Sequence, residues 1–334
     1  MIRLEVPFRE PFVTAGGRLS GRELLILRLE NEDGLIGVGE AAPLPGYDGQ
    51  TIEGCAAFVR RPGAGGSPPP AARACLELAE LDLRGRSQGL STLGGDGSEI
   101  AVNLTIPAGP PDRAAELAAA GRHAGHDHFK VKVGLADDEQ RLAAVRAAIG
   151  PQAALRVDAN GAWTVAEALR AIGAIEHHGI EFVEQPCATL PELAELRRSI
   201  SVPIAADESI RGADDVREAA RQEACDIVCL KLSTCGGPQA AREALREAER
   251  AGLGACLSST LDGPWGISAA LRLAATERVT TACGLATLNL FSGPLADALA
   301  DARGGTITVP PGTGLGIALD PLDLAEVTVE ELED

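Results

Sequence analysis

Short apolar runs alternate with longer Ala-rich amphipathic stretches along the last two thirds of the chain. The stretches 137–150 and 164–179 have the spacing of helices that cover a sheet on one face. Strands that alternate with such helices predict a parallel sheet, and seven or eight of them predict closure into a barrel. The candidate strands are 99–106, 128–133, 154–159, 180–185, 203–208, 225–232, 254–259 and a weaker one at 280–288.

The first part of the chain has a different pattern, with strand-like runs joined by turns. Asp33-Gly34 lies between two apolar runs and predicts a hairpin. A helix follows over 71–86, with Gly85 as its expected stop. We therefore expect an α+β capping domain over 1–92, completed by the tail from about 304 to 334, and a barrel over 93–303. An open doubly wound sheet is the rival fold, but no Gly-rich phosphate loop follows an early strand.

Five ionisable residues lie near the ends of successive candidate strands, 23 to 26 residues apart: Lys132, Asp158, Glu184, Asp207 and Lys231. In a parallel barrel the carboxyl ends of the strands meet at one mouth, where reactions take place. Three converging carboxylates repel one another unless a cation neutralises them, and hard oxygen ligands favour Mg²⁺, with Mn²⁺ as an alternative. Taken singly, Asp207 has a simpler interpretation as a helix cap.

The lysines add the chemistry of a base. Lys130 and Lys132 are two residues apart on one strand, so both amines face the same side. Desolvation and a neighbouring like charge both lower the pKa of a lysine, which makes its amine a usable base. The alternative is that both side chains reach solvent at the strand end. Lys231 follows the apolar run 227–230, so a surface role is less expected there.

Other polar residues near these strand ends have weaker signals. Asn160 lies two residues after Asp158 and either shares its side of the strand or forms a turn. Ser258 and Ser259 end the seventh candidate strand and either bind a substrate carboxylate or form a turn. We expect the histidines in loops or at helix ends, away from the lysines, so a histidine base is not predicted.

Composition narrows the possible partners. A formal net charge of −18 argues against a nucleic acid or an anionic membrane. The eight cysteines form no CxxC pair, which favours reduced, buried thiols in a cytoplasmic protein. The amino terminus lacks the layout of a signal peptide, and no apolar run is long enough to span a bilayer. The sequence is compatible with an oligomer but does not specify one.

The combination of Lys130-Val131-Lys132, the three acids and Lys231 resembles the enolase superfamily, in particular its muconate-lactonizing subgroup. The resemblance covers nearly the whole chain. It implies an α+β capping domain on a modified (β7α)β barrel of the TIM type. It also implies that Asp158, Glu184 and Asp207 hold Mg²⁺ and that Lys132 and Lys231 are the catalytic pair. The substrate would be a small-molecule carboxylate.

Within this subgroup, several phrases resemble the o-succinylbenzoate synthase family of menaquinone biosynthesis: 39–53, 184–187, 206–211, 258–267 and, more weakly, 283–290. The resemblance implies syn dehydration of 2-succinyl-6-hydroxy-2,4-cyclohexadiene-1-carboxylate. Gly263-Pro264-Trp265 departs from the small polar residues expected after Asp262. Asp262 is itself a candidate for binding substrate or supporting the site.

Dipeptide epimerases and N-acyl amino acid racemases of the same subgroup use the same two lysines and are the main alternative. Epimerases carry an Asp-x-Asp pair near the last strand to bind an ammonium group, whereas this chain has Gly284-Leu285-Ala286 there. A barrel that only binds carboxylates is an alternative of another class, but such a protein would be expected to lack a ligand or a lysine.

The resemblance also predicts which loops close the site. The loop 11–17, which includes Thr14, Gly16 and Gly17, is the expected lid, and Tyr47 lies on a second capping loop. The alternative is that both are ordinary surface turns. Glu208 is expected to hydrogen-bond Lys231 and fix its position.

Overall fold

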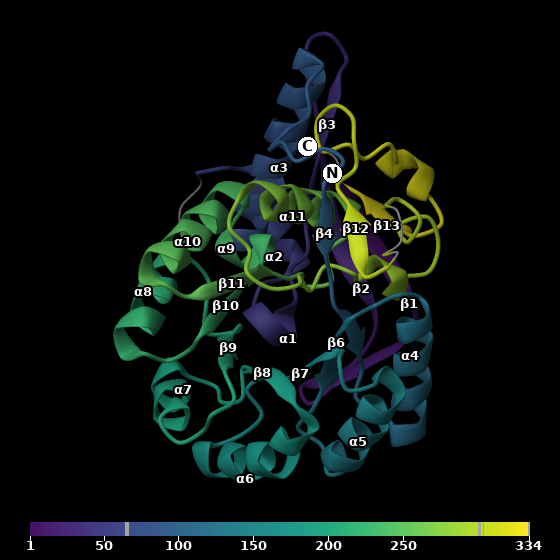
Figure 1. Cartoon of the computed structure of the whole chain (residues 1–334). Helices are drawn as coiled ribbons and strands as arrows, with labels where there is room; N and C mark the ends of the chain where they lie inside the picture. The colour runs from purple at the N-terminus through teal and green to yellow at the C-terminus, as the bar shows by residue number, and fades with distance from the viewer. Residues whose placement is uncertain (64–66, 300–301, 303, 333–334) are drawn as a thin grey trace.

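The structure is a computed structural model that describes residues 1–63, 67–299, 302 and 304–332. An antiparallel sheet with its own helices sits beside a ring of parallel strands surrounded by helices, as Figure 1 shows. The expected domain boundary at 303 and the last two residues of the tail lie outside the described residues. None of the described helices is both long and apolar enough to cross a membrane.

The antiparallel sheet has the strand order β13-β1-β2-β3. Along the first half of β1, even-numbered residues are buried and most odd-numbered ones are not, as expected when one face packs on a core. The predicted hairpin at Asp33-Gly34 is confirmed, since β2 and β3 pair in antiparallel register on either side of it. The strands are β1 (Ile2–Thr14), β2 (Gly17–Glu30), β3 (Ile36–Ala41) and β13 (Thr328–Glu331).

Three helices accompany this sheet: α1 (Pro45–Asp48), α2 (Ile52–Arg60) and α3 (Pro70–Gln88). Helix α3 packs so closely on β3 that a Cβ at Gly39 would lie 1.9 Å from the Cys75 carbonyl oxygen. The expected stop at Gly85 is wrong, because α3 continues to Gln88 and ends at Gly89, which has a left-handed φ of 65°. A Cβ at Gly85 would lie 2.3 Å from Thr92 Oγ1, so this glycine permits close packing.

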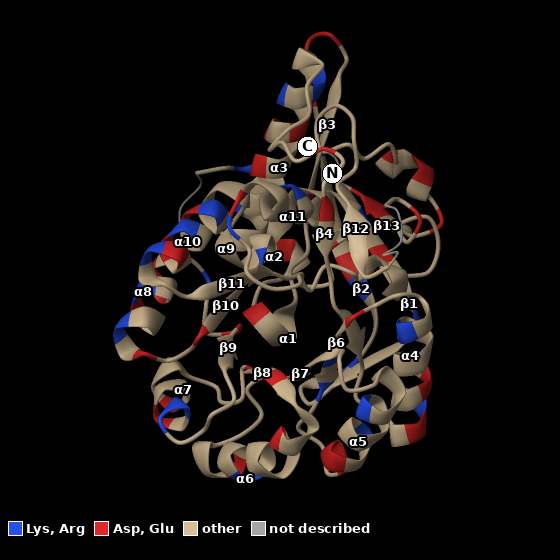
Figure 2. Cartoon of the chain, viewed as in Figure 1, with Lys and Arg blue, Asp and Glu red and all other residues tan. Residues whose placement is uncertain are grey.

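The parallel sheet has seven strands in the order β11-β10-β9-β8-β7-β6-β5. Its strands are β5 (Leu104–Ile106), β6 (His128–Lys132), β7 (Ala154–Asp158), β8 (Ile180–Glu184), β9 (Ile204–Ala206), β10 (Ile227–Leu230) and β11 (Gly254–Leu257). The α-helices of this part are α4 (Pro111–His123), α5 (Asp138–Ile149), α6 (Val165–Ile175), α7 (Leu190–Arg197), α8 (Ala213–Gln222), α9 (Leu232–Cys235), α10 (Pro238–Ala251) and α11 (Pro264–Thr276). Short 3₁₀ turns are η1 (Glu176–His178), η2 (Leu288–Leu290) and η3 (Pro321–Leu324). Acidic and basic residues are mixed along outer helices such as α8 and α10 (Figure 2).

Two candidate strands differ from expectation at the point where the barrel closes. The run 99–106 is divided: β4 (Glu99–Ala101) pairs with β12 (Thr306–Thr308), and only β5 joins the parallel sheet. The segment 280–288 forms no described strand. It makes single bridges from Cys283 to Val102 and from Gly284 to Ser258. These bridges join the two edges of the sheet, so the barrel closes through isolated pairs.

The prediction for the cysteines is confirmed in its structural part, because all eight are buried and free. His128 does not fit the expectation for histidines, because it is the first residue of β6. Its side chain faces Arg156, with 3.4 Å between His128 Nδ1 and an Arg156 guanidinium nitrogen.

A buried acid connects the end of β3 with the start of α11. Glu40 Oε1 accepts a hydrogen bond of 2.6 Å from Gly263 N, and Glu40 is only 3 % exposed. Desolvation, followed by the charge of Asp262, raises the pKa of Glu40 from its ordinary 4.5 to about 8. A Cβ at Gly263 would lie 2.7 Å from Glu40 Oε2, so the residue after Asp262 must be small.

Glu40→Gln should make stability less dependent on pH. The unfolded chain releases the Glu40 proton near pH 4.5, whereas the folded chain holds it to about 8. The native state is therefore progressively penalised as pH rises through this window. As pH rises from mildly acidic to mildly alkaline, the free energy of unfolding of the variant should increase relative to that of the parent by on the order of 1–3 kcal/mol. Urea unfolding at several pH values measures this gain. Glu80→Gln, at an exposed position on α3, is the matched control, and equal pH slopes for all three proteins would contradict the prediction.

Candidate active site

The register of the parallel strands brings the predicted residues together. Lys132 on β6 lies opposite Asp158 on β7, and Asp158 lies opposite Glu184 on β8. Asp207 and Lys231 directly follow β9 and β10. All five side chains therefore project from the same end of the sheet, and each residue is at most 7 % exposed.

Lys130 and Lys132 form a buried network with the acids of the next two strands. Lys130 Nζ is 2.9 Å from Glu184 Oε1 and 3.2 Å from Asp158 Oδ2. Lys132 Nζ donates to the same Asp158 oxygen at 2.6 Å and to Asn160 Oδ1 at 2.9 Å. The alternative in which these two lysines reach solvent is therefore wrong.

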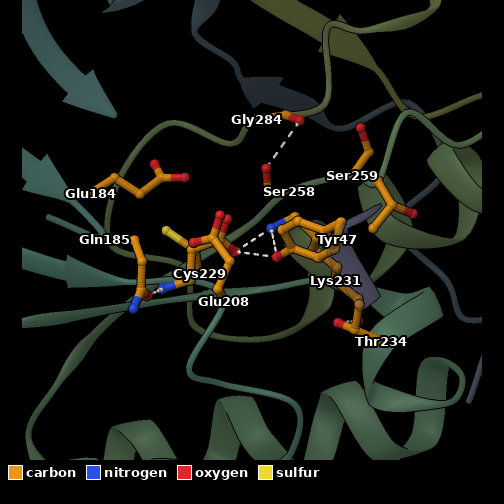
Figure 3. Close-up of polar contacts among 12 residues, drawn as sticks. Tyr47, Glu184, Gln185, Glu208, Cys229, Lys231, Thr234, Ser258, Ser259 and Gly284 are labelled. Atoms are coloured by element: carbon orange, nitrogen blue, oxygen red, sulfur yellow. Dashed lines mark hydrogen bonds and ion pairs between the residues drawn. The ribbon is translucent and has the colours of Figure 1, made fainter. Parts of the chain in front are cut away.

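Lys231 lies on the other side of the site and contacts the capping helix α1. Its Nζ donates to Tyr47 Oη at 2.6 Å (Figure 3). The same nitrogen forms an ion pair with Asp207 Oδ1. Tyr47 Oη also donates to Asp207 Oδ1 at 3.2 Å. Tyr47 was expected on a capping loop, but its contact with the lysine could not be read from the sequence.

Asn160 lies in a turn, and its side chain also belongs to the charged network. Both interpretations considered from the sequence, a turn and a position beside Asp158, are therefore confirmed. Its φ is 49°, a left-handed conformation that asparagine tolerates better than most residues. Its Nδ2 donates to Glu208 Oε1 at 3.0 Å. The expected hydrogen bond from Glu208 to Lys231 is wrong, because Glu208 pairs with Asn160 instead.

Gln185 orients Asp207 and was missed in the sequence. Its side-chain Oε1 accepts a hydrogen bond of 2.8 Å from Asp207 N, and its Nε2 donates to Ser209 Oγ at 2.6 Å. Gln185 is fully buried and has a φ of 37°. The amide next to Glu184 therefore fixes the start of the neighbouring loop.

Burial and mutual repulsion give the acids different pKa values. Asp158 is desolvated, but Lys132 and Lys130 outweigh this and hold the pKa of its carboxyl below the usual range. Burial and then the charge of Asp158 raise the pKa of Glu184 to about 7. Burial and then the charge of Asp207 raise the pKa of Glu208 to about 8.

The neighbouring carboxylates also change the pKa values of the lysines, in the direction opposite to the sequence expectation. Burial disfavours the Lys130 ammonium, but Glu184 and Asp158 outweigh burial and raise the pKa of Lys130. Burial is likewise outweighed at Lys231, chiefly by Asp207, so the pKa of Lys231 is raised well above its ordinary value. The lowered pKa expected from two adjacent lysines is wrong for Lys130, because carboxylates surround it.

The donor set fits a hard divalent cation. Asp158, Glu184 and Asp207 offer carboxylate oxygens from three consecutive strand ends, and Glu184 is strongly disfavoured as a buried anion. Lys130 lies between Asp158 and Glu184, and the oxygens of the three acids are spread over more than 4.8 Å. A cation would therefore compete with the Lys130 ammonium for these carboxylates.

A cavity of about 480 Å³ opens over these groups and is covered by the capping elements. Thr14, Gly16, Gly17 and Arg18 line one wall, and Tyr47 lines another. The expected lid loop is the tip of the β1–β2 hairpin, with Val13 opposite Arg18 in the strand register. Both segments wall the cavity, and their role as a lid stays a prediction.

The serines line the cavity, and Asp262 does not. Ser258 Oγ approaches the Gly284 carbonyl oxygen at 3.5 Å (Figure 3). Ser259 Oγ is 2.9 Å from Thr287 Oγ1. Asp262 lies behind the wall, where its carboxylate accepts a hydrogen bond of 2.8 Å from Thr260 N. Asp262 therefore supports the wall of the cavity.

The chain contains only three lysines, and all three are in this site. Every other basic side chain outside histidine is an arginine. Arginine remains charged under almost all conditions, whereas a lysine amine can lose its proton. Lysine usage along the sequence is a signal that could have marked the site without any motif.

A family model described as "Enolase C-terminal domain-like" matches residues 112–323. The chain belongs to the enolase superfamily. The o-succinylbenzoate synthase of Thermobifida fusca (strain YX) is 43% identical over 230 residues, covering 67% of this chain and 68% of that protein. The o-succinylbenzoate synthase of Mycobacterium tuberculosis (strain H37Rv) is 44% identical over 212 residues, covering 61% of this chain and 63% of that protein.

Solved structures of this superfamily share the fold over nearly the full length. An N-succinyl Arg/Lys racemase from Bacillus cereus gives a TM-score of 0.91 at 26% identity, covering 98% of this chain and 96% of that one. A dipeptide epimerase from Enterococcus faecalis gives a TM-score of 0.86 at 28% identity, covering 94% of this chain and 97% of that one. A muconate lactonizing enzyme from Pseudomonas fluorescens gives a TM-score of 0.87 at 27% identity, covering 98% of this chain and 97% of that one. The chain is therefore an enzyme, related by sequence to o-succinylbenzoate synthases and by structure also to racemases and epimerases.

Lys130→Met should destabilise the enzyme in the presence of chelator, because Asp158 and Glu184 then lose their shared counter-charge. We expect a loss of about 3 kcal/mol, typical of a broken buried ion pair. Added Mg²⁺ should restore more stability in the variant than in the parent. Urea unfolding with chelator and with Mg²⁺ measures both effects.

Arg113→Met is the control, because Arg113 pairs with Glu10 and Glu116 on the surface. Its loss should cost at most about 1 kcal/mol, with no change in the response to Mg²⁺. An equal response to Mg²⁺ in all three proteins would show that Lys130 and the cation do not share the carboxylates.

Proposed function

We propose that the enzyme removes a proton alpha to a carboxylate with the help of Mg²⁺ and then eliminates water. The proposed substrate is 2-succinyl-6-hydroxy-2,4-cyclohexadiene-1-carboxylate and the product is o-succinylbenzoate. The sequence similarity to o-succinylbenzoate synthases supports this choice. The observation that carries the proposal is the placement of two buried lysines on opposite sides of a row of carboxylates.

The strand order explains why the two amines face each other. β6 and β10 are separated by β7, β8 and β9, and those three strands present Asp158, Glu184 and Asp207. A substrate whose carboxylate lies over the acids would therefore have Lys132 on one side and Lys231 on the other. The alpha carbon is then within reach of an amine on either side.

Lys132 acts as the base in this proposal. Its amine takes the alpha proton and later returns a proton to the departing hydroxyl group, which leaves as water. The carbon–hydrogen and carbon–oxygen bonds break and one carbon–carbon double bond forms, so the ring becomes aromatic. Asp158 and Asn160 hold the Lys132 amine by hydrogen bonds and fix its direction.

Asp158, Glu184 and Asp207 would hold the cation. Bound Mg²⁺, or Mn²⁺ in its place, would supply positive charge where negative charge develops on the substrate carboxylate. The dipeptide epimerase of Enterococcus faecalis was solved with Mg and a dipeptide, which supports the choice of metal.

Lys231 remains protonated and stabilises the developing negative charge from the opposite side. The ion pair between its amine and Asp207 favours the ammonium form. Tyr47 Oη accepts from the amine and donates to Asp207, so the capping helix holds Lys231 in place. Closure of the cap also excludes water from the reacting carbon.

The cavity wall favours a second carboxylate on the substrate. Arg18 lines the cavity, and the structure records no hydrogen bond or ion pair for its guanidinium among the described residues. Gly284 also lines the wall, and a Cβ there would lie 2.4 Å from Ser258 Oγ. An acid to bind an ammonium group therefore has no room at Gly284. The proposed substrate has a ring carboxylate and a succinyl carboxylate, which fits this arrangement.

A racemase or epimerase is the second candidate, supported by the likeness to an N-succinyl Arg/Lys racemase. There the two lysines would exchange protons with the alpha carbon from opposite faces. In this reaction Lys231 must lose its proton to act as a base, whereas in the dehydration it acts only as an ammonium. An N-succinyl amino acid also has two carboxylates, so Arg18 does not separate the two candidates.

Lys132→Ala should lower turnover of the diene substrate by at least about 1,000-fold, because the base is lost. Lys132→Arg should be equally inactive, since it keeps the charge but not the titratable amine. Loss of diene absorbance with Mg²⁺, and its arrest by chelator, measures the reaction. Retained turnover in either variant would remove Lys132 as the base.

Deuterium exchange separates the two candidates. N-succinyl amino acids in D₂O should exchange at the alpha carbon from both faces if the enzyme is a racemase, and Lys231→Arg should abolish one of them. If dehydration is the principal reaction, the diene should be the faster substrate. A folded, Mg²⁺-loaded enzyme that does not turn over the diene would reject the synthase assignment.

Arg18→Gln should lower kcat/KM by about 10-fold, as expected for the loss of one charge-assisted hydrogen bond. Most of the change should appear in KM, because Arg18 would bind a part of the substrate that does not react. Arg18→Lys retains the charge and should recover part of the loss. An unchanged KM in Arg18→Gln would show that the second carboxylate lies elsewhere.

A further inference from the structure

A second group of metal-type ligands lies on the outer layer of the barrel, apart from the cavity. Glu139 is in the first turn of α5, and His177 and His178 form the 3₁₀ turn η1 that precedes β8. Helices α5 and α6 belong to two neighbouring βα units of the barrel (Figure 1), and η1 directly follows α6. None of the three residues lines the cavity or takes part in the proposed reaction.

The three side chains converge on one point. His178 Nε2 is 3.7 Å from Glu139 Oε1, and His177 Nε2 is 4.0 Å from the same oxygen. One ligand atom from each residue lies within 4.8 Å of the others, the only such trio among the described His, Cys, Asp and Glu residues. The imidazole rings lie against each other, with centroids 4.0 Å apart.

The state of His178 indicates that its nitrogen is available to a ligand. The side chain is only 9 % exposed, and its Nε2 is buried without a hydrogen-bond partner. A buried ring nitrogen without a partner is unfavourable in a native protein. Burial, followed by the nearby His177, lowers the pKa of His178, which favours the neutral form of its imidazole.

The groups around the trio set the expected strength of binding. The negative charge of Glu139 favours a bound cation, whereas the nearby positive charge of Arg146 disfavours it. The Arg146 guanidinium is directed at backbone carbonyl oxygens, including His178 O at 2.8 Å and Ala153 O at 2.7 Å. It therefore holds the η1 turn in place, and its charge weakens cation binding without occupying the ligand atoms.

We propose that Glu139, His177 and His178 form a binding site for a transition-metal dication of the zinc class, with water completing the coordination. Two imidazoles and one carboxylate are typical ligands for Zn²⁺, whereas Mg²⁺ prefers oxygen ligands only. Ligand distances of 3.7 and 4.0 Å need only small side-chain movements to surround one ion. Bound metal would join α5 to the turn before β8, the strand that carries Glu184.

The test is binding of Zn²⁺ to the full-length enzyme in the presence of saturating Mg²⁺, which under the proposed function would occupy the acids of the cavity. We expect one equivalent of Zn²⁺ to bind by calorimetry and to raise the melting temperature by mass action. Co²⁺ as a spectroscopic probe should give visible absorption bands of a site with nitrogen ligands.

Glu139→Gln is the mildest variant, because Glu139 is exposed and its loss should not disturb folding. It should weaken Zn²⁺ binding at least about 10-fold, and the double variant His177→Ala/His178→Ala should abolish binding and the Co²⁺ bands. His123→Ala, at an exposed histidine at the end of α4, is the control and should bind Zn²⁺ like the parent. Diene turnover with Mg²⁺ should be unchanged in Glu139→Gln. No Zn²⁺ binding by the parent, or unchanged binding in the double variant, would overturn the proposal.

Discussion

The mutual neutralisation of lysines and acids at one end of the barrel is the interaction on which the rest of the structure depends. Lys130, Lys132 and Lys231 are buried with Asp158, Glu184 and Asp207, and none of these charges is stable there alone. Hydrogen-bonded register between neighbouring strands places Lys132 beside Asp158 and Asp158 beside Glu184. The parallel sheet therefore makes a buried charged site possible, because it positions opposite charges next to one another.

The capping part completes this site and does more than cover it. Tyr47 on α1 contacts both Lys231 and Asp207, and the tip of the β1–β2 hairpin brings Arg18 to the cavity. The close packing of α3 on β3 and the buried Glu40 at the start of α11 fix this part relative to the barrel. The cavity and its charged groups are thus built from elements that are far apart in the sequence.

Several features could be predicted because they follow from local periodicity. The strand ends that carry the lysines and acids were correctly placed, since each lies at the end of a short apolar run. The errors arose where tertiary packing decides. Gly85 serves a close contact within α3 and does not end it, and the run 99–106 divides between two sheets. Segment 280–288 closes the barrel through single bridges at Cys283 and Gly284, so the strand expected there does not form.

By itself, the sequence determined the alternation of strands and helices, the order of lysines and acids, and the likeness to the enolase superfamily. These depend on spacing along the chain, which a parallel barrel converts directly into position. Only the tertiary structure decided that Tyr47 holds Lys231, that Glu208 pairs with Asn160, and that acids raise the pKa of Lys130 and Lys231. Burial and contacts between distant segments set these properties, because the energy of a charge depends on its three-dimensional neighbours and not on its place in the sequence.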